Sequence, residues 1–253
     1  MKIDPNDLEV VFASLPTFGS VAKFYGDIPY KSDPDRLGMI VVDPAWLEER
    51  TVVLSADEDL PGFPGFQGQQ VSGVRLHRLI APLFKAAWAE LVTLGLHVRL
   101  RSYDGAFMAR HKLFDINRAL SLHAYGAAID FDARWNGYGL PIQQAGIDRD
   151  VVRVFERFGF SWGGRWRIPD AMHFEAVKPR PGALWDIRPF HERVPPPFAS
   201  GYNRKVIVLR DREVLEVHTL PDSYHVVTRS DFEGNFWIDM RSPELDGHEE
   251  PRS

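Results

Sequence analysis

The pattern of apolar residues agrees with an α+β fold, because two helix-like stretches and several short strand-like runs lie on one chain. Residues 77–94 place apolar side chains three or four positions apart, which predicts a helix that Gly95 would end. His77, near its start, is expected as a surface or capping residue. A second helix is predicted over residues 149–157, where one face is apolar and Gly159 follows.

The composition is ordinary for a soluble globular protein of 253 residues, with 44% hydrophobic and 26% charged residues. The formal net charge of -5 argues against a nucleic-acid partner, because nucleic-acid-binding surfaces are usually basic. The chain has no cysteine, so disulfides, thiolate nucleophiles and thiolate metal ligands are excluded. Any metal ion must therefore be held by histidine nitrogen and carboxylate oxygen.

The first residues of the sequence lack the basic segment and the apolar stretch of a secretory signal peptide. No run approaches the roughly 20 apolar residues that a membrane-spanning helix needs. We therefore expect synthesis in the cytoplasm without a signal peptide, and no membrane span. If the substrate lies outside the membrane, another agent must deliver the protein to it.

Three segments are expected from composition and turn signals. Residues 1–70 read as a loop-rich N-terminal lead-in, residues 71–194 as the domain with the candidate site, and residues 198–253 as a small all-β module. The three prolines at positions 195–197 form a stiff spacer and mark the best domain boundary. Strands are expected over residues 39–42, 51–54, 98–100, 205–209, 214–218, 224–227 and 235–239.

A first polar group lies in an apolar, glycine-punctuated stretch. Residues 127–132 are apolar except for Asp130 and Asp132, and His123 lies shortly before them. A buried carboxylate is costly unless it is paired or binds a metal ion. The two aspartates fall on one strand face by the two-residue period, so spacing alone allows either to be a ligand. A buried ion pair with His123 is the competing interpretation.

A second polar group surrounds His173, which lies in a strand-like run after an aromatic, glycine-rich turn. Zinc binds imidazole nitrogen and carboxylate oxygen, and a catalytic site needs three such ligands and one open position. His123, Asp130 and His173 supply such a set. Asp170 could take a proton from metal-bound water and pass one to a departing amine. Glu175 is the competing base, or it orients the histidine two residues before it.

The two groups together form one motif. It reads Ser121-x-His123-x-x-Gly126-x-Ala128-x-Asp130, then Trp162-Gly163-Gly164 and Asp170-x-x-His173-Phe174-Glu175. The motif resembles that of the zinc D-Ala-D-Ala carboxypeptidase family, and within it the L-alanyl-D-glutamate endopeptidase branch, which includes many phage endolysins. The resemblance covers roughly residues 70–180. It implies an α+β fold of the hedgehog and DD-peptidase type, in which an antiparallel sheet carries the metal site and helices flank it.

The resemblance also implies a role for each residue of the motif. A Zn²⁺ ion would be held by His123, Asp130 and His173, which selects Asp130 over Asp132. Asp170 would be the general acid and base.

The family further places an arginine before the first histidine, where it stabilises the oxyanion. Arg110 matches this position best, and Arg101 and Arg118 are alternatives. The residues that follow Arg110 lack the proline and glycine often found there, which weakens this assignment alone.

Three further residues are expected around the ligands. Ser121, Glu175 and Trp166 would orient the metal ligands or contact the substrate. Trp162, Trp166 and Tyr125 could line a groove for glycan or stem peptide, or pack in the core between the two parts of the motif; core packing is preferred for Trp162, and both places stay open for Trp166.

The function implied by the resemblance is zinc-dependent hydrolysis of peptidoglycan stem peptides, with the bond between L-Ala and D-Glu preferred. D-Ala-D-Ala carboxypeptidase activity uses the same motif residues and is an alternative. A different class, an inactive wall-binding or phage structural protein that binds through residues 198–253, is also considered. Family members that act on their own cell wall usually carry an export signal, so the expected absence of one favours a phage-type lysin released through a membrane lesion.

Overall fold

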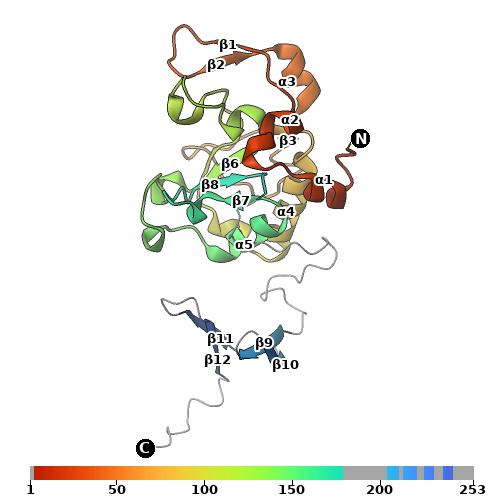
Figure 1. Ribbon diagram of the computed structural model, residues 1–253, viewed down its shortest axis with the longest axis vertical. Helices are drawn as coiled ribbons and strands as arrows, with labels where there is room; N and C mark the ends of the chain where they lie inside the picture. Colours follow the sequence, from red (N-terminus) through yellow and green to blue (C-terminus); the bar gives the residue numbers. More distant parts are fainter. Residues whose placement is uncertain (1–2, 179–203, 211–212, 221–224, 231–235, 242–253) are drawn as a thin grey trace, which may run out of the picture. The chain divides into compact units, whose positions relative to one another are not determined.

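The computed structural model describes residues 3–178, 204–210, 213–220, 225–230 and 236–241 (Figure 1). By its internal contacts the chain divides into two compact units, Met1–Pro196 and Pro197–Ser253. In the second unit, β9 (Arg204–Arg210) pairs with β10 (Glu213–Leu220) and β11 (His225–Ser230) pairs with β12 (Phe236–Arg241), both antiparallel. The four strands expected after the prolines are therefore present, with slightly different bounds.

The first unit begins with helices that the sequence did not predict. They are α1 (Leu8–Ser14), α2 (Val21–Tyr25) and α3 (Pro44–Arg50). Asp7 and Asp43 accept hydrogen bonds from the first backbone N–H groups of α1 and α3. Pro44 begins α3, where its missing N–H would be unpaired anyway. The lead-in is therefore less loop-rich than expected.

Two small antiparallel sheets and several single-turn helices connect these elements. β1 (Tyr30–Ser32) pairs with β2 (Ile40–Val42), and β3 (Thr51–Ser55) pairs with β4 (Gly73–His77). β2 and β3 confirm the strands expected over residues 39–42 and 51–54. The 3-10 helices are η1 (Phe18–Ser20), η2 (His97–Arg99), η3 (Lys112–Phe114), η4 (Leu122–Tyr125), η5 (Ala133–Trp135), η6 (Ile142–Gln144) and η7 (Gly163–Arg165).

The largest sheet holds four short antiparallel strands in the order β5-β6-β8-β7. They are β5 (Tyr103–Gly105), β6 (Ala128–Phe131), β7 (Ser161–Trp162) and β8 (His173–Glu175). Two helices, α4 (Ala81–Thr93) and α5 (Arg149–Arg157), lie beside this sheet (Figure 1). Mixed helices and small antiparallel sheets are compatible with the α+β class.

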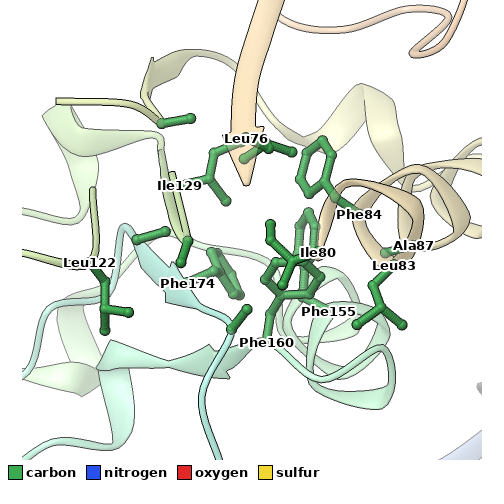
Figure 2. Packing of buried hydrophobic residues seen from close by; sticks show 14 of the residues in the cluster. Leu76, Ile80, Leu83, Phe84, Ala87, Leu122, Ile129, Phe155, Phe160 and Phe174 are labelled. Carbon is green, nitrogen blue, oxygen red and sulfur yellow. The ribbon is translucent and has the colours of Figure 1, made fainter. Parts of the chain in front are cut away.

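Aromatic side chains join α4 and α5 to one face of this sheet (Figure 2). Phe84 of α4 stacks on Phe155 of α5 with ring centroids 5.9 Å apart, and Phe155 lies 4.7 Å from Phe174 of β8. Phe131 of β6 stacks on Phe155 at 5.7 Å. Burial of each such side chain contributes roughly 1.5–3 kcal/mol, so this layer fixes the sheet against the two helices.

The bounds of α5 agree with expectation, whereas the start of α4 and the expected strand at residues 98–100 do not. α4 begins at Ala81 rather than at residue 77, because the preceding residues form β4 and then turn. Residues 98–100 are not a strand, since most of them belong to η2. None of the helices in the described part of the chain has the length and apolar character needed to cross a bilayer.

His77 is buried at the end of β4, so its expected surface position is wrong. Its Nε2–H donates to the carbonyl of Tyr25 at 3.0 Å, and its Nδ1 accepts from the N–H of Leu79 at 3.2 Å. Burial lowers the pKa of His77 to about 4. The neutral ring therefore connects α2 to the turn that leads into α4.

Candidate metal centre

Strand pairing brings Asp130 and His173 together. The two residues are directly opposite each other in the antiparallel pair of β6 and β8. Side chains alternate along a strand, so both point to the face opposite Phe131 and Phe174, which pack toward α5. The apolar layer that fixes the register of the sheet therefore also places this polar pair.

His123 comes from η4, the turn before β6. The hydroxyl of Ser121 caps η4 by accepting the N–H of His123 at 3.4 Å. The imidazole ring of His123 is buried, and its Nδ1–H donates to the carbonyl of Ala106 at 2.7 Å. A carbonyl can only accept, so this contact leaves Nε2 with a free lone pair.

Three donor atoms converge at this place. His123 Nε2 lies 3.2 Å from His173 Nδ1 and 3.2 Å from Asp130 Oδ2. His173 Nδ1 lies 2.8 Å from Asp130 Oδ1. Among the residues that the structure describes, these three side chains are the one group placed to share a metal ion. Imidazole nitrogen and carboxylate oxygen are common ligands of divalent transition metals, so the group could hold such an ion.

Glu175 fixes the orientation of His173. The two side chains share a face of β8, and Glu175 Oε2 accepts the Nε2–H of His173 at 3.2 Å, which leaves Nδ1 facing the other donors. Burial alone would lower the pKa of His173, but the hydrogen bonds with Asp130 and Glu175 raise it to about 10. A metal ion that binds here must therefore displace a proton from this ring.

Asp130, and not Asp132, faces the two histidines. Asp132 lies past the end of β6 with a φ of 57°, so the two aspartates do not share a strand face as expected. Its buried carboxylate accepts the backbone N–H groups of Arg101 and Ser102 at 2.7 and 2.9 Å and thus joins two segments. Burial would raise the pKa of Asp130, but the two histidines hold it well below its ordinary value.

Asp170 lies in the turn before β8. Its N–H donates to the carbonyl of Gly163 at 3.0 Å, and its own carbonyl accepts the N–H of His173 at 3.1 Å. A Cβ on Gly163 would lie 2.5 Å from the Asp170 carbonyl oxygen, so this close approach requires glycine. Burial raises the pKa of Asp170, although the charge of His173 acts in the opposite direction. Its Oδ1 is buried without a hydrogen-bond partner among the described residues.

Of the three candidate arginines, Arg110 is within electrostatic range of Asp130 and Asp170. Burial lowers the pKa of its half-buried guanidinium, and the negative charges of Asp130 and Asp170 act against that shift. Arg101 instead forms an ion pair with Asp132, with Nε 3.1 Å from Oδ2. Arg118 forms an exposed ion pair with a neighbouring carboxylate at 3.2 Å.

The aromatic residues of the motif take two different places. Trp162 is buried, and its Nε1–H donates to the carbonyl of Ala171 at 2.8 Å, so it packs in the core as preferred. Tyr125 is buried as well. Trp166 is only partly buried. The centre of its ring lies 5.3 Å from that of His173, so it is beside the candidate metal ligands.

Two contributions to the site were not predicted from the sequence. One is the carbonyl of Ala106, which sets the tautomer of His123. Every residue has a backbone carbonyl, so the sequence does not indicate which one will accept this hydrogen bond. The other is Tyr25 of α2, whose hydroxyl donates to the carbonyl of Ala176. Burial, and then the charge of Glu175, raises the pKa of Tyr25, so the Tyr25 hydroxyl is within electrostatic range of the carboxylate that holds His173.

A family model described as D-alanyl-D-alanine carboxypeptidase matches residues 115–176. The matched stretch contains the three candidate ligands together with Asp170 and Glu175, and it begins after Arg110. The match supports the peptidase family that the motif resembles, and with it a metallopeptidase. No curated protein and no solved structure matches the chain.

Proposed function

We propose that the chain is a zinc peptidase that hydrolyses peptidoglycan stem peptides between L-Ala and D-Glu. The observation that carries the proposal is the convergence of His123, Asp130 and His173 within electrostatic range of Asp170, whose buried Oδ1 has no hydrogen-bond partner among the described residues. A set of metal ligands alone would also suit a structural site. A buried carboxylate with a free oxygen near that set is what peptide hydrolysis requires.

The donor atoms fit zinc. In tetrahedral zinc sites the ligand bonds are about 2.0–2.2 Å long, so neighbouring ligand atoms lie roughly 3.3 Å apart. Here the two histidine nitrogens lie 3.2 Å apart, His173 Nδ1 lies 2.8 Å from Asp130 Oδ1, and His123 Nε2 lies 3.2 Å from Asp130 Oδ2. Each histidine has its other ring nitrogen hydrogen-bonded, to Ala106 or to Glu175, as in zinc-binding histidines generally. Three protein ligands leave a fourth position open, which is typical of catalytic zinc.

The residues around the donors divide the work of hydrolysis. Zinc, when bound, supplies Lewis acidity that polarises a carbonyl and makes water acidic enough to react near neutral pH. Asp170 accepts the proton of the attacking water and returns a proton to the departing amine. Its raised pKa suits both steps, because a more acidic carboxylate would hold the proton too weakly. Arg110 supplies positive charge to the oxygen on which negative charge develops.

D-Ala-D-Ala carboxypeptidase activity is the second candidate, and the description of the family match favours it. Both reactions use the same ligands and the same base. They differ in the substrate: a carboxypeptidase acts at a free carboxyl terminus, whereas an endopeptidase must accept peptide on both sides of the bond. The endopeptidase is preferred because the motif is most similar to that branch.

The test is digestion of purified peptidoglycan by the zinc-loaded protein, with and without a chelator, followed by mass spectrometry. Chelator-sensitive release of peptides with a new D-Glu amino terminus is expected. Release of free D-Ala would identify the carboxypeptidase instead. Stoichiometric zinc with no released product would contradict an enzyme and favour a wall-binding protein.

A further inference from the structure

Arg110 lies in a backbone segment that is paired on both sides. On one side, Met39 faces Arg110 across an antiparallel bridge. The hydrogen bonds that flank this bridge run from the Ile40 N–H to the Ala109 carbonyl at 2.9 Å and from the His111 N–H to the Gly38 carbonyl at 2.8 Å. Residues 38–40, about 70 positions earlier in the chain, therefore fix the backbone next to Arg110.

The other side of the segment leads directly to the metal ligands. The carbonyl of Arg110 accepts the N–H of Ser121 at 3.0 Å. Ser121 in turn caps the short helix that carries His123. The position of Arg110 relative to His123 is thus set through Ser121, by one main-chain hydrogen bond and by the side-chain cap on the His123 N–H.

The side chain of Arg110 is oriented by neutral contacts. Its Cζ lies 4.9 Å from the ring centre of Phe114, within the range of a cation–π interaction. Its N–H groups lie 3.3 Å from the Met108 sulfur and 3.3 Å from the His111 carbonyl. No carboxylate of the described residues lies within ion-pair distance of Arg110. Among the described residues, the Arg110 guanidinium therefore forms no salt bridge, and its positive charge is available to a substrate.

The turn that presents Phe114 is strained and is supported by Gly38. Leu113 and Phe114 have φ of 54° and 57°, values that large side chains rarely adopt. Gly38 is buried with a φ of 75°, and a Cβ there would lie 2.1 Å from the Phe114 carbonyl oxygen. The strained turn and residues 38–40 therefore fit together only if position 38 is glycine.

We infer that Gly38 and Phe114 are positioning residues that hold the Arg110 guanidinium in place for the reaction. The inference rests on the proposed function, because it assumes that Arg110 stabilises developing negative charge. Preorganised charge is effective only if it does not have to reorient during the reaction. An arginine without an ion pair needs other contacts to keep its guanidinium oriented. The ring of Phe114 and the main-chain pairing to residues 38–40 supply these contacts.

The first test is a double-mutant cycle on zinc-loaded protein with a soluble stem peptide. Phe114→Ala is expected to lower kcat about 5-fold with little change in KM, as befits the loss of an exposed cation–π contact. In the Arg110→Ala background the same change should have no further effect. Phe114→Tyr, which keeps an aromatic face, should retain the wild-type kcat. Ile116→Ala is the matched control, because it removes an exposed apolar side chain from the same loop.

The second test follows the main chain and does not depend on activity. Gly38→Ala should speed amide hydrogen exchange at His111 by at least about 10-fold, whereas Gly68→Ala should not. Gly68 is the matched control, with a φ of 80° and open space where its Cβ would stand.

The inference would be overturned if Phe114→Ala changed kcat equally in the wild-type and Arg110→Ala proteins, or if Gly38→Ala left amide exchange at His111 unchanged. In either case, turnover by the wild-type protein would leave the proposed function standing. A wild-type protein with protected His111 and no turnover would overturn the proposed function, and the positioning role with it.

Discussion

Asp170 is the residue whose loss should separate metal binding from catalysis. It contributes no atom to the group of three candidate ligands, its Oδ1 has no hydrogen-bond partner among the described residues, and its carboxyl is within electrostatic range of Asp130 and His173. We predict that Asp170→Asn keeps stoichiometric zinc and lowers kcat about 100-fold or more, because the amide cannot accept the proton of water. Metal analysis and stem-peptide kinetics on the same preparation check this. Turnover close to wild type in this variant would move the base to Glu175.

Glu175 should act on zinc affinity instead. Its carboxylate accepts the Nε2–H of His173, and such partners of zinc-binding histidines typically contribute 10–100-fold to affinity. Glu175→Gln should therefore weaken zinc binding by roughly that factor, as measured by competition with a calibrated chelator. Excess zinc should then restore turnover. A variant that bound zinc normally and stayed inactive at saturating zinc would identify Glu175 as the base.

The sequence identified the candidate ligands by type and order, but it did not determine all of the local geometry. Spacing alone allowed either Asp130 or Asp132, and only the end of β6 at Phe131 removes the second from the strand face. Which nitrogen of each histidine faces the group depends on the Ala106 carbonyl and the Glu175 carboxylate. A carbonyl contact of this kind comes from tertiary packing and has no counterpart in a motif.

At the scale of elements, the turn between β7 and β8 holds the proposed base. Gly163 is in contact with the backbone of Asp170, where a Cβ would approach the carbonyl oxygen to 2.5 Å. Gly163→Ala should displace this turn and lower kcat up to about 100-fold, because small displacements of a catalytic group have large effects on rate. Zinc content should remain stoichiometric. Gly137→Ala, at a position with open space, is the control and should match the wild type in both measurements.

The bounds of the helices show which sequence signals carried information. α5 was predicted with its observed ends, because its apolar face and the glycine that follows it mark the helix, and in the structure Asp148 caps its start. α4 was extended too far, since Leu76, Leu79 and Ile80 continue the apolar spacing although they belong to a strand end and a turn. Pro82 in the first turn marked the true start. Short alternating runs such as residues 98–100 do not distinguish a strand from a single helical turn.

At the scale of the whole molecule, His77 should make stability depend on pH. Its pKa is about 4 in the folded protein, below the ordinary value of 6.5. Between these values the unfolded chain binds a proton that the folded protein does not, so stability is full above pH 6.5 and falls as the pH drops toward 4. The loss is about 3 kcal/mol at most.

Unfolding by denaturant at pH 7, 6, 5 and 4 measures this dependence. His77→Gln offers a donor and an acceptor of similar reach but cannot take up a proton, so its stability should change less over the same range. Carboxylates elsewhere titrate in both proteins, which makes the difference between the two curves the quantity to compare. Parallel curves would show that His77 is not responsible.

The division of the chain at Pro196 leads to the last prediction. The three candidate metal ligands, together with Asp170 and Arg110, lie in the first unit. The helices that pack on the central sheet lie there as well. A chain of residues 1–196 should therefore bind one zinc ion and hydrolyse a soluble stem peptide with kcat and KM within about 2-fold of the full chain, as expected of an independently folding domain. Kinetics on the two proteins, with their thermal unfolding midpoints, check this. If the short chain folded but lost activity on the soluble peptide, residues 197–253 would belong to the substrate site. If it did not fold, they would belong to the core of the enzyme.

Activity retained on the soluble peptide but lost on intact peptidoglycan would give the second unit a role in binding the wall.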